Sequence, residues 1–123
     1  QDSNPIRGSI CRAARDIAHQ VGARAIIVES ATGKVARAMV HFRPDVPIIA
    51  VVTSSLVCKK LCLNWGITAL IGEEKKTSDA ITKQAMEKAL STGYFKKGDI
   101  VVVISSNRTA PTSSTDSLNV RIL

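Results

Sequence analysis

The chain has 123 residues, and its 17 lysines and arginines outnumber its 10 aspartates and glutamates, which gives a formal net charge of +7. This length suits one domain with a sizeable core, built mainly from aliphatic side chains because only 3% of the residues are aromatic. No apolar run approaches the roughly 18 residues of a membrane span, and the basic residues are scattered without a nucleic-acid-binding motif. We therefore expect neither a membrane nor nucleic acid as a partner, although the positive charge favours phosphates.

The hydrophobic pattern predicts helices that alternate with short strands. Each expected helix start offers a capping residue or the first residue of a helical apolar stripe. The helices are expected to run from Asn4–Pro5 to Gly22, from Lys34 to Phe42, from Thr53 or Ser54 to about Asn64, and from Thr77 or Ser78 to Gly93. The strands are expected at 25–28, 48–52, 67–71, 100–104 and 118–123.

This order of elements predicts the fold class. Helices that alternate with strands imply a parallel sheet with helices on both faces, and the apolar run IIAVV at 48–52 is typical of a strand buried on both sides. A loop at 105–117, rich in serine and threonine, joins the last two strands and allows the final one to run antiparallel. We predict an α/β domain with three layers, α/β/α, around a five-stranded, mostly parallel sheet.

The turn after the first strand, Glu29 to Lys34, carries the most distinctive chemistry. It presents hydroxyls, a glycine and a lysine directly before a helix. The first N–H groups of a helix have no intrahelical partner, and the helix dipole favours negative charge there, so the turn predicts an anion site. The alternative is an ordinary helix cap, since serine, threonine and glycine are common in such turns.

The other reactive side chains indicate no catalytic set and no metal site. Cys11, Cys58 and Cys62 are an odd number without tight spacing, which favours reduced thiols that act as small buried hydrophobes. His19 and His41 do not combine with them into a metal-ligand or triad spacing. The sequence begins without methionine and without a signal-peptide core, so we expect a piece of a longer cytoplasmic protein.

Three segments together resemble one known domain. They are AIIVESATGKVARAMVHFRPDVPIIAVV at 25–52, TGYFKKGDIVVVIS at 92–105 and SSTDSLNVRIL at 113–123. This order of strand, hydroxyl-rich turn, helix, Phe-Arg-Pro and strand resembles the C-terminal domain of pyruvate kinase over about 5–123. The resemblance implies a five-stranded sheet flanked by helices, with the last strand antiparallel.

The resemblance also implies a binding site for a phosphorylated sugar such as fructose 1,6-bisphosphate. The turn is similar to the family's phosphate-binding turn: Ser30 and Thr32 would donate hydroxyls, Gly33 would let the backbone approach, and Lys34 would supply charge. The stretch 74–83 lacks the tryptophan and arginine that many members use for a second phosphate, leaving Lys75, Lys76 or Lys83 as weak substitutes. In the loop before the last strand the residues implied to meet a phosphate are Arg108, Ser113, Ser114 and Thr115.

The parent enzyme that the resemblance implies transfers a phosphoryl group from phosphoenolpyruvate to ADP, giving pyruvate and ATP in glycolysis. Its catalytic residues, Mg²⁺ or Mn²⁺, and K⁺ would belong to a (β/α)8 barrel that this chain does not contain, so the chain alone is expected to be non-catalytic and free of cofactors. The implied partners are that barrel and further copies of the chain in a homotetramer.

A different class of function stays open at this point. A stand-alone phosphate- or nucleotide-binding module would share the same fold, because a fold does not fix a function. The motifs G-x-G-x-x-G and G-x-x-x-x-G-K-[ST] are both absent, which weakens the dinucleotide and P-loop versions of that alternative.

Overall fold

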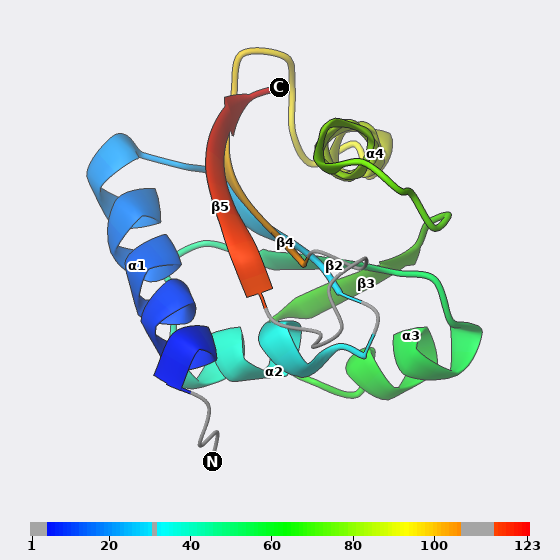
Figure 1. The fold of residues 1–123 in the computed structure, drawn as a ribbon. Coiled ribbons are helices and arrows are strands. Elements are labelled where there is room, and N and C mark those ends of the chain that lie inside the picture. The colour runs from blue at the N-terminus through cyan, green and yellow to red at the C-terminus, as the bar shows by residue number, and fades with distance from the viewer. Residues whose placement is uncertain (1–4, 31, 107–114) are drawn as a thin grey trace.

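The structure, a computed structural model, describes residues 5–30, 32–106 and 115–123. Its elements alternate along the chain as the hydrophobic pattern predicts (Figure 1). The helices are α1 (Pro5–Val21), α2 (Lys34–His41), α3 (Ser55–Leu61) and α4 (Ser78–Ser91). The strands are β1 (Ala25–Glu29), β2 (Ile48–Val52), β3 (Ile67–Ile71), β4 (Ile100–Ser106) and β5 (Thr115–Ile122).

One five-stranded sheet has the order β3-β2-β1-β4-β5. The first four strands are parallel, with Ile27 beside Ile49 of β2 and Val103 of β4, and β5 is antiparallel to β4. The chain builds outward from β1 through β2 to β3 and then crosses to β4 on the other side of β1. The strand order therefore reverses between β1 and β4, which is the topological switch point of such a sheet.

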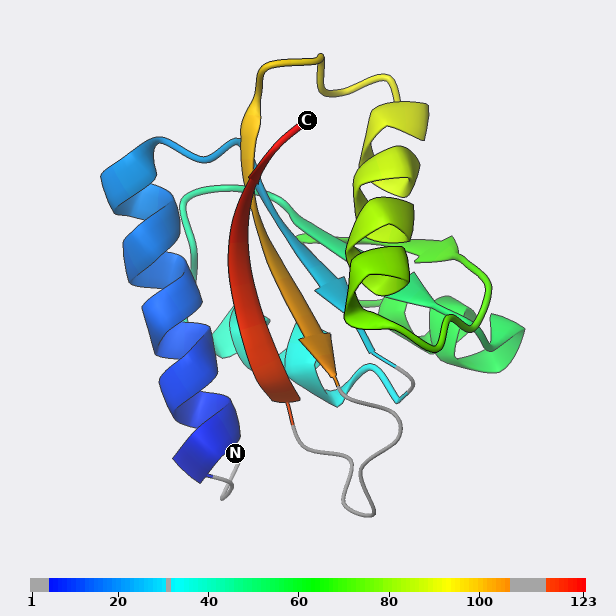
Figure 2. The same cartoon turned by 45° about the horizontal axis from the view of Figure 1, so that its top comes forward.

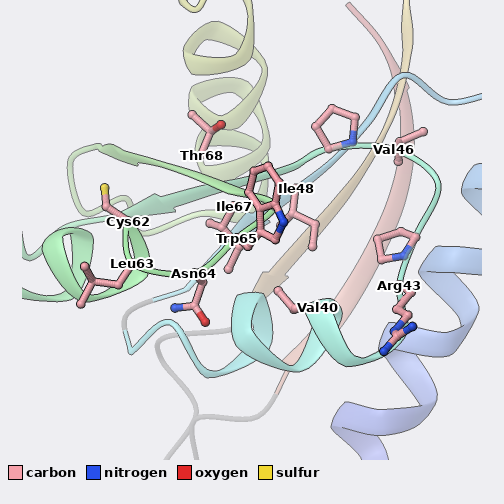
Figure 3. Close-up of a pocket in the computed structure, with 13 residues that line it drawn as sticks. Val40, Arg43, Val46, Ile48, Cys62, Leu63, Asn64, Trp65, Ile67 and Thr68 are labelled. Atoms are coloured by element: carbon pink, nitrogen blue, oxygen red, sulfur yellow. The ribbon is translucent and has the colours of Figure 1, made fainter.

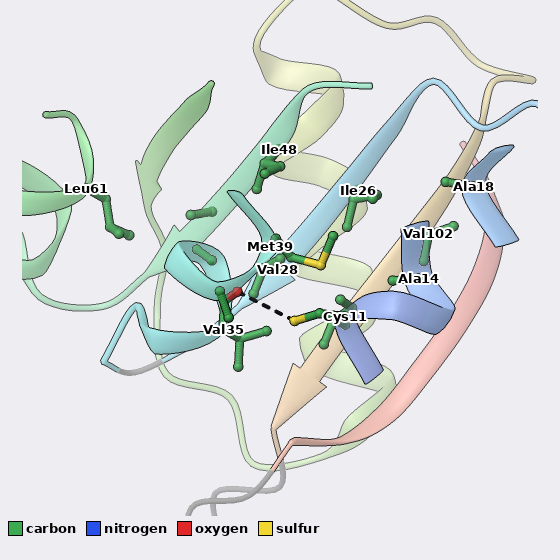
Figure 4. Close-up of a cluster of buried hydrophobic side chains, with 14 of the residues drawn as sticks. Cys11, Ala14, Ala18, Ile26, Val28, Val35, Met39, Ile48, Leu61 and Val102 are labelled. Carbon is green, nitrogen blue, oxygen red and sulfur yellow. Dashed lines mark hydrogen bonds between the residues drawn. The ribbon is translucent and has the colours of Figure 1, made fainter. Parts of the chain in front are cut away.

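The helices divide between the two faces of the sheet, as Figures 1 and 2 show. On one face, α1, α2 and the end of α3 cover β1, β2 and β4; Figure 4 shows Cys11, Met39 and Leu61 in this core cluster. On the other face α4 packs through Ala85 and Ala89. The small residues on α4 let the helix approach the sheet closely, and the predicted three-layer α/β/α architecture is confirmed.

The strand bounds confirm the first three predicted strands and correct the last two. β4 extends to Ser106 and β5 begins at Thr115, whereas the sequence analysis placed an irregular loop over 105–117. Ser105 pairs with Ser117, and Ser106 pairs with Thr115 after a shift in register. Backbone hydrogen bonds between the two strands extend them beyond the predicted ends. The sequence could not predict this extension, because these residues show no alternation of apolar and polar side chains.

The predicted helix caps are confirmed for α3 and α4. The Ser54 hydroxyl accepts a hydrogen bond from Val57 N at 3.3 Å, and the Thr77 hydroxyl accepts one from Ala80 N at 3.1 Å. Each cap uses one of the helix N–H groups that lack an intrahelical partner. The predicted cap Asn4 lies outside the described residues.

The three cysteines differ in burial. Cys11 is fully buried in α1, where its thiol donates to the carbonyl oxygen of Val35 at 4.0 Å (Figure 4). Cys58 is half-buried and Cys62 is exposed, so the prediction of small buried hydrophobes is wrong for Cys62. Cys62 is the C-cap residue of α3, next to Leu61, which is the residue that this end of the helix buries. Within the described ranges, every helix is too short or too polar to cross a bilayer.

Candidate functional site

The turn singled out by its sequence lies at the switch point of the sheet. β1 ends at Glu29, Ser30 follows it, and α2 begins at Lys34. Glu29 pairs with Ser105 near the end of β4, so β1 and β4 end side by side at the carboxyl edge of the sheet (Figure 2). Open α/β sheets bind ligands at this place, because diverging connections leave a crevice there. Of the predicted residues, Arg108, Ser113 and Ser114 lie outside the described residues, as does the side chain of Thr115.

Two hydroxyl groups hold the turn in shape. The Ser30 side chain is buried, and its oxygen accepts a hydrogen bond from Gly33 N at 3.1 Å. The exposed Thr32 hydroxyl accepts one from Lys34 N at 3.4 Å. The N-cap residue of α2 is Gly33, which has no side-chain cap, so the two hydroxyls hold the turn itself in shape. Of the two hydroxyls, only that of Thr32 is exposed to an incoming anion.

Gly33 fits this turn for two reasons. Its φ of +78° lies in the left-handed region that side chains disfavour. A Cβ added there would lie 3.1 Å from a methyl carbon of Leu61 and 3.2 Å from one of Val57. Two side chains of α3 thus pack directly against the backbone of the turn, and this contact constrains the position of the turn.

Two basic side chains border the turn. Lys34 is exposed at the first position of α2. Arg37, which the sequence analysis did not name, lies one helical turn further on, and its guanidinium donates to the carbonyl oxygen of Thr32 at 3.5 Å. The sequence could have identified Arg37 as a second cation of the site, because it lies three residues after Lys34 and residues three apart share a helix face.

A buried polar network lies behind the turn, on the α4 side of the sheet. Gln84 of α4 donates to the Glu29 carboxylate at 3.2 Å and to the carbonyl oxygen of Glu73 at 2.8 Å, and its own oxygen accepts from Glu73 N at 2.7 Å. Glu29 and Gln84 are 2% and 7% exposed. Because side chains alternate along a strand, Glu29 points with Ile27 toward α4 and away from the start of α2. The network ties the end of β1 to α4 and to the segment after β3.

The predicted substitutes for a second phosphate contact do not gather at the turn. Lys75 forms an ion pair with Glu73, with 3.5 Å between Nζ and the carboxylate oxygen. Lys83 is exposed on α4, which covers the opposite face of the sheet from α2. The described residues thus support one anion at the turn better than two.

A groove lies at the opposite, amino end of the sheet (Figure 3). It encloses about 870 Å³ between the end of α2, the segment before β2 and the segment between α3 and β3. Trp65 is 94% exposed and Leu63 is 88% exposed, an unusual exposure for large apolar side chains. We call this feature the Trp65 groove. Its lining is Val40, Arg43, Pro44, Val46, Pro47, Ile48, Cys62, Leu63, Asn64, Trp65, Gly66, Ile67 and Thr68.

Metal ligation finds no support in the part of the chain that the structure describes. That part contains no group of three or more histidine, cysteine, aspartate or glutamate side chains that could hold one ion. His19 instead lies 3.1 Å from the Asp45 carboxylate on the exposed surface.

Comparison with known proteins gives one consistent family. The family model described as "Pyruvate kinase, alpha/beta domain" matches residues 8–121. The pyruvate kinase of Clostridium acetobutylicum is 36% identical over 121 residues, which are 98% of this chain and 25% of that relative. The pyruvate kinase of Bacillus licheniformis is 31% identical over 103 residues, 84% of this chain and 18% of that relative. The chain thus spans a quarter or less of the length of these relatives.

A solved structure shares the fold. The structure titled "Cryptosporidium parvum pyruvate kinase in complex with ADP" superposes with a TM-score of 0.83, covering 99% of this chain and 24% of that one. Its sequence identity is 22%, so this likeness bears on the fold alone. It agrees with the five-stranded sheet and the antiparallel last strand.

Proposed function

Because the chain belongs to the pyruvate kinase family, as its alpha/beta domain, we propose that it is the C-terminal regulatory and assembly domain of a longer pyruvate kinase. The observation that carries the proposal is the family match over 8–121 together with relatives of which the chain covers a quarter or less. The parent enzyme would move a phosphoryl group from phosphoenolpyruvate to ADP in the cytoplasm, where glycolysis runs. Its catalytic barrel would position the phosphates and neutralise their charge.

The metal chemistry belongs to that barrel in this proposal. Mg²⁺ and K⁺ would neutralise the phosphates of the two substrates there. The described residues of this chain do not fit such ions, since they bring no three suitable ligands together. The chain's own contribution is therefore binding and assembly.

The proposed ligand of the turn is one phosphate group of a sugar phosphate. Lys34 and Arg37 supply positive charge, the N-terminus of α2 lies at the turn, and the hydroxyls of Ser30 and Thr32 lie in the turn. Gly33 supplies the left-handed backbone that leads from the turn into α2. We also propose the contacts that the sequence predicts in the segment before the last strand, namely Arg108, Ser113, Ser114 and Thr115.

Two further surfaces suit the proposed assembly. β5 lies at the edge of the described sheet and exposes Val120 and Ile122, and an edge strand offers a row of backbone groups to a second copy. The Trp65 groove, at the other end of the sheet, offers exposed apolar area for the catalytic barrel of the same subunit. We assign β5 to copy–copy contacts within a tetramer and the groove to the barrel.

A direct assay tests the enzymatic part of the proposal. The 123-residue chain and the full-length product of its gene are each supplied with phosphoenolpyruvate, ADP, Mg²⁺ and K⁺, and pyruvate formation is followed. We expect activity from the full-length protein and none from the chain alone. A gene product without a barrel, or one that is inactive, contradicts the proposal and favours a stand-alone binding module.

A further inference from the structure

Two of the three cysteines lie one helical turn apart at the end of α3. Cys62 N donates to the carbonyl oxygen of Cys58 at 3.0 Å, so the two residues follow each other along one side of the helix. Cys58 is half-buried against the core, whereas Cys62 is exposed and lines the Trp65 groove. Burial and the neighbouring Cys62 thiol both raise the pKa of Cys58, which is the effect expected when two thiols interact directly.

We propose that Cys58 and Cys62 form a reversible disulfide across the last turn of α3, a modification site separate from the anion-binding turn.

The geometry predicts a strained bond, which forms only when the last turn of α3 tightens and is then easily reduced. Cβ atoms four residues apart on a helix lie about 5–6 Å from each other, whereas a disulfide needs about 3.5–4.5 Å. The last turn must therefore tighten by roughly 1–2 Å. Cys62 is the residue that caps α3, and the exposed segment Leu63–Trp65 follows it, so the end of the helix has room to adjust. Strained, exposed disulfides have oxidising potentials and are the labile ones.

The two thiols would act in a fixed order with a low-molecular-weight disulfide as the oxidant. The Cys62 thiolate attacks one sulfur of that disulfide, which forms a mixed disulfide and releases one small thiol. The Cys58 thiolate then attacks the Cys62 sulfur, which forms the Cys58–Cys62 bond and releases the second small thiol. Two protein thiols are oxidised while one small disulfide is reduced to two thiols. Cys62 goes first because it is exposed and because the pKa of Cys58 is raised, which leaves less thiolate there.

The chain contains its own control and its own reporter. Cys11 is fully buried on α1 and takes no part in the pair, so it should stay reduced. Trp65 is the single tryptophan of the chain and lies three residues after Cys62. A tightened turn at Cys62 should therefore change the fluorescence of Trp65.

The test treats the reduced 123-residue chain with oxidised glutathione and follows intact mass, peptide linkage and Trp65 fluorescence. We expect a transient glutathione adduct at Cys62, then a product lighter than the reduced chain by two hydrogen atoms, with the linkage at Cys58–Cys62 and with Cys11 still a thiol. The rate of the second step should not depend on protein concentration, and a mild thiol reductant should restore mass and fluorescence.

Matched variants locate the steps. Cys58→Ser should stop at the mixed disulfide on Cys62, whereas Cys11→Ser should oxidise as the wild type does. A wild-type chain that keeps stable glutathione adducts without losing the two hydrogens overturns the proposal. Products linked between chains, or through Cys11, also overturn it.

Discussion

Gly33 shows how a single residue fixes the proposed anion site. Its left-handed backbone lets the chain pass from β1 into α2 within a short turn, and its missing Cβ lets Leu61 pack directly on the turn. The buried Ser30 hydroxyl accepts a hydrogen bond from the Gly33 N–H. The same three features that shape the turn therefore place Lys34 at the beginning of the helix, where an anion is favoured.

We predict that Gly33→Ala destabilises the chain more than Gly93→Ala. The two glycines have nearly equal φ values, +78° and +79°, but a Cβ at Gly93 would have no atom within 4 Å. Gly93→Ala should cost about 1 kcal/mol from the left-handed backbone alone. Gly33→Ala should cost about 2–4 kcal/mol, because Leu61 must also move.

Urea denaturation of both variants and the wild type measures this difference. Equal losses would mean that the contact between α3 and the turn does not constrain the turn.

Among the elements, α4 is joined to the rest of the domain by more than apolar packing. Gln84 makes three hydrogen bonds that connect it to the end of β1 and to the segment after β3. Since Glu29 directly precedes Ser30 in the chain, this network also supports the turn from behind. Buried polar groups thus link the position of α4 to the turn that carries the proposed anion site.

We predict that Gln84→Ala destabilises the chain by about 2–4 kcal/mol, because three hydrogen bonds of about 0.5–1.5 kcal/mol each are lost from a buried place. Lys83→Ala, at the exposed neighbouring position on α4, should change stability by less than about 0.5 kcal/mol. The amide hydrogen of Glu73 should exchange faster in Gln84→Ala, as hydrogen exchange with mass or NMR detection would record. An unchanged exchange rate at Glu73 would show that the network does not hold this segment.

Sequence reasoning located most elements and only part of the site. Apolar runs such as IIAVV identified β2 because buried parallel strands have that composition, and Ser54 and Thr77 identified helix starts because capping is local chemistry. The beginning of β5 was missed because backbone pairing with Ser106 decides it. The Glu29–Gln84 contact was missed because 55 positions separate its partners, and only the fold brings them together.

At the scale of the whole molecule, the edge of the sheet is the feature that bears on assembly. β5 closes one side of the sheet and β3 closes the other, and each exposes an isoleucine: Ile122 is 65% exposed and Ile71 is 49% exposed. Symmetric pairing of β5 with a second copy would satisfy its outer backbone groups and cover Ile122. This pairing would leave the Trp65 groove uncovered, because the groove lies at the amino ends of β2 and β3.

We predict that Ile122→Lys weakens self-association of the chain, because a charge would replace an apolar contact on the face of the paired β5 strands. Ile71→Lys places the same charge on the other edge strand and should leave self-association unchanged. Sedimentation velocity over a range of concentrations compares the three proteins. Equal behaviour of both variants and the wild type would remove β5 from the assembly proposal.

The central claim is that a phosphorylated sugar binds at the turn from Ser30 to Lys34, and thermal shift titration tests it most directly. Fructose 1,6-bisphosphate and glucose 6-phosphate are titrated into the wild-type chain, Lys34→Ala, and Lys97→Ala, which removes an equally exposed lysine from the turn before β4. A ligand that binds only the folded state raises the unfolding midpoint, and above the Kd the rise grows with the logarithm of the ligand concentration. We predict such a rise for wild type and Lys97→Ala, and about tenfold weaker binding, roughly 1.4 kcal/mol, for Lys34→Ala. No rise at millimolar ligand, or equal rises in all three proteins, would contradict the claim and leave assembly as the role of this domain.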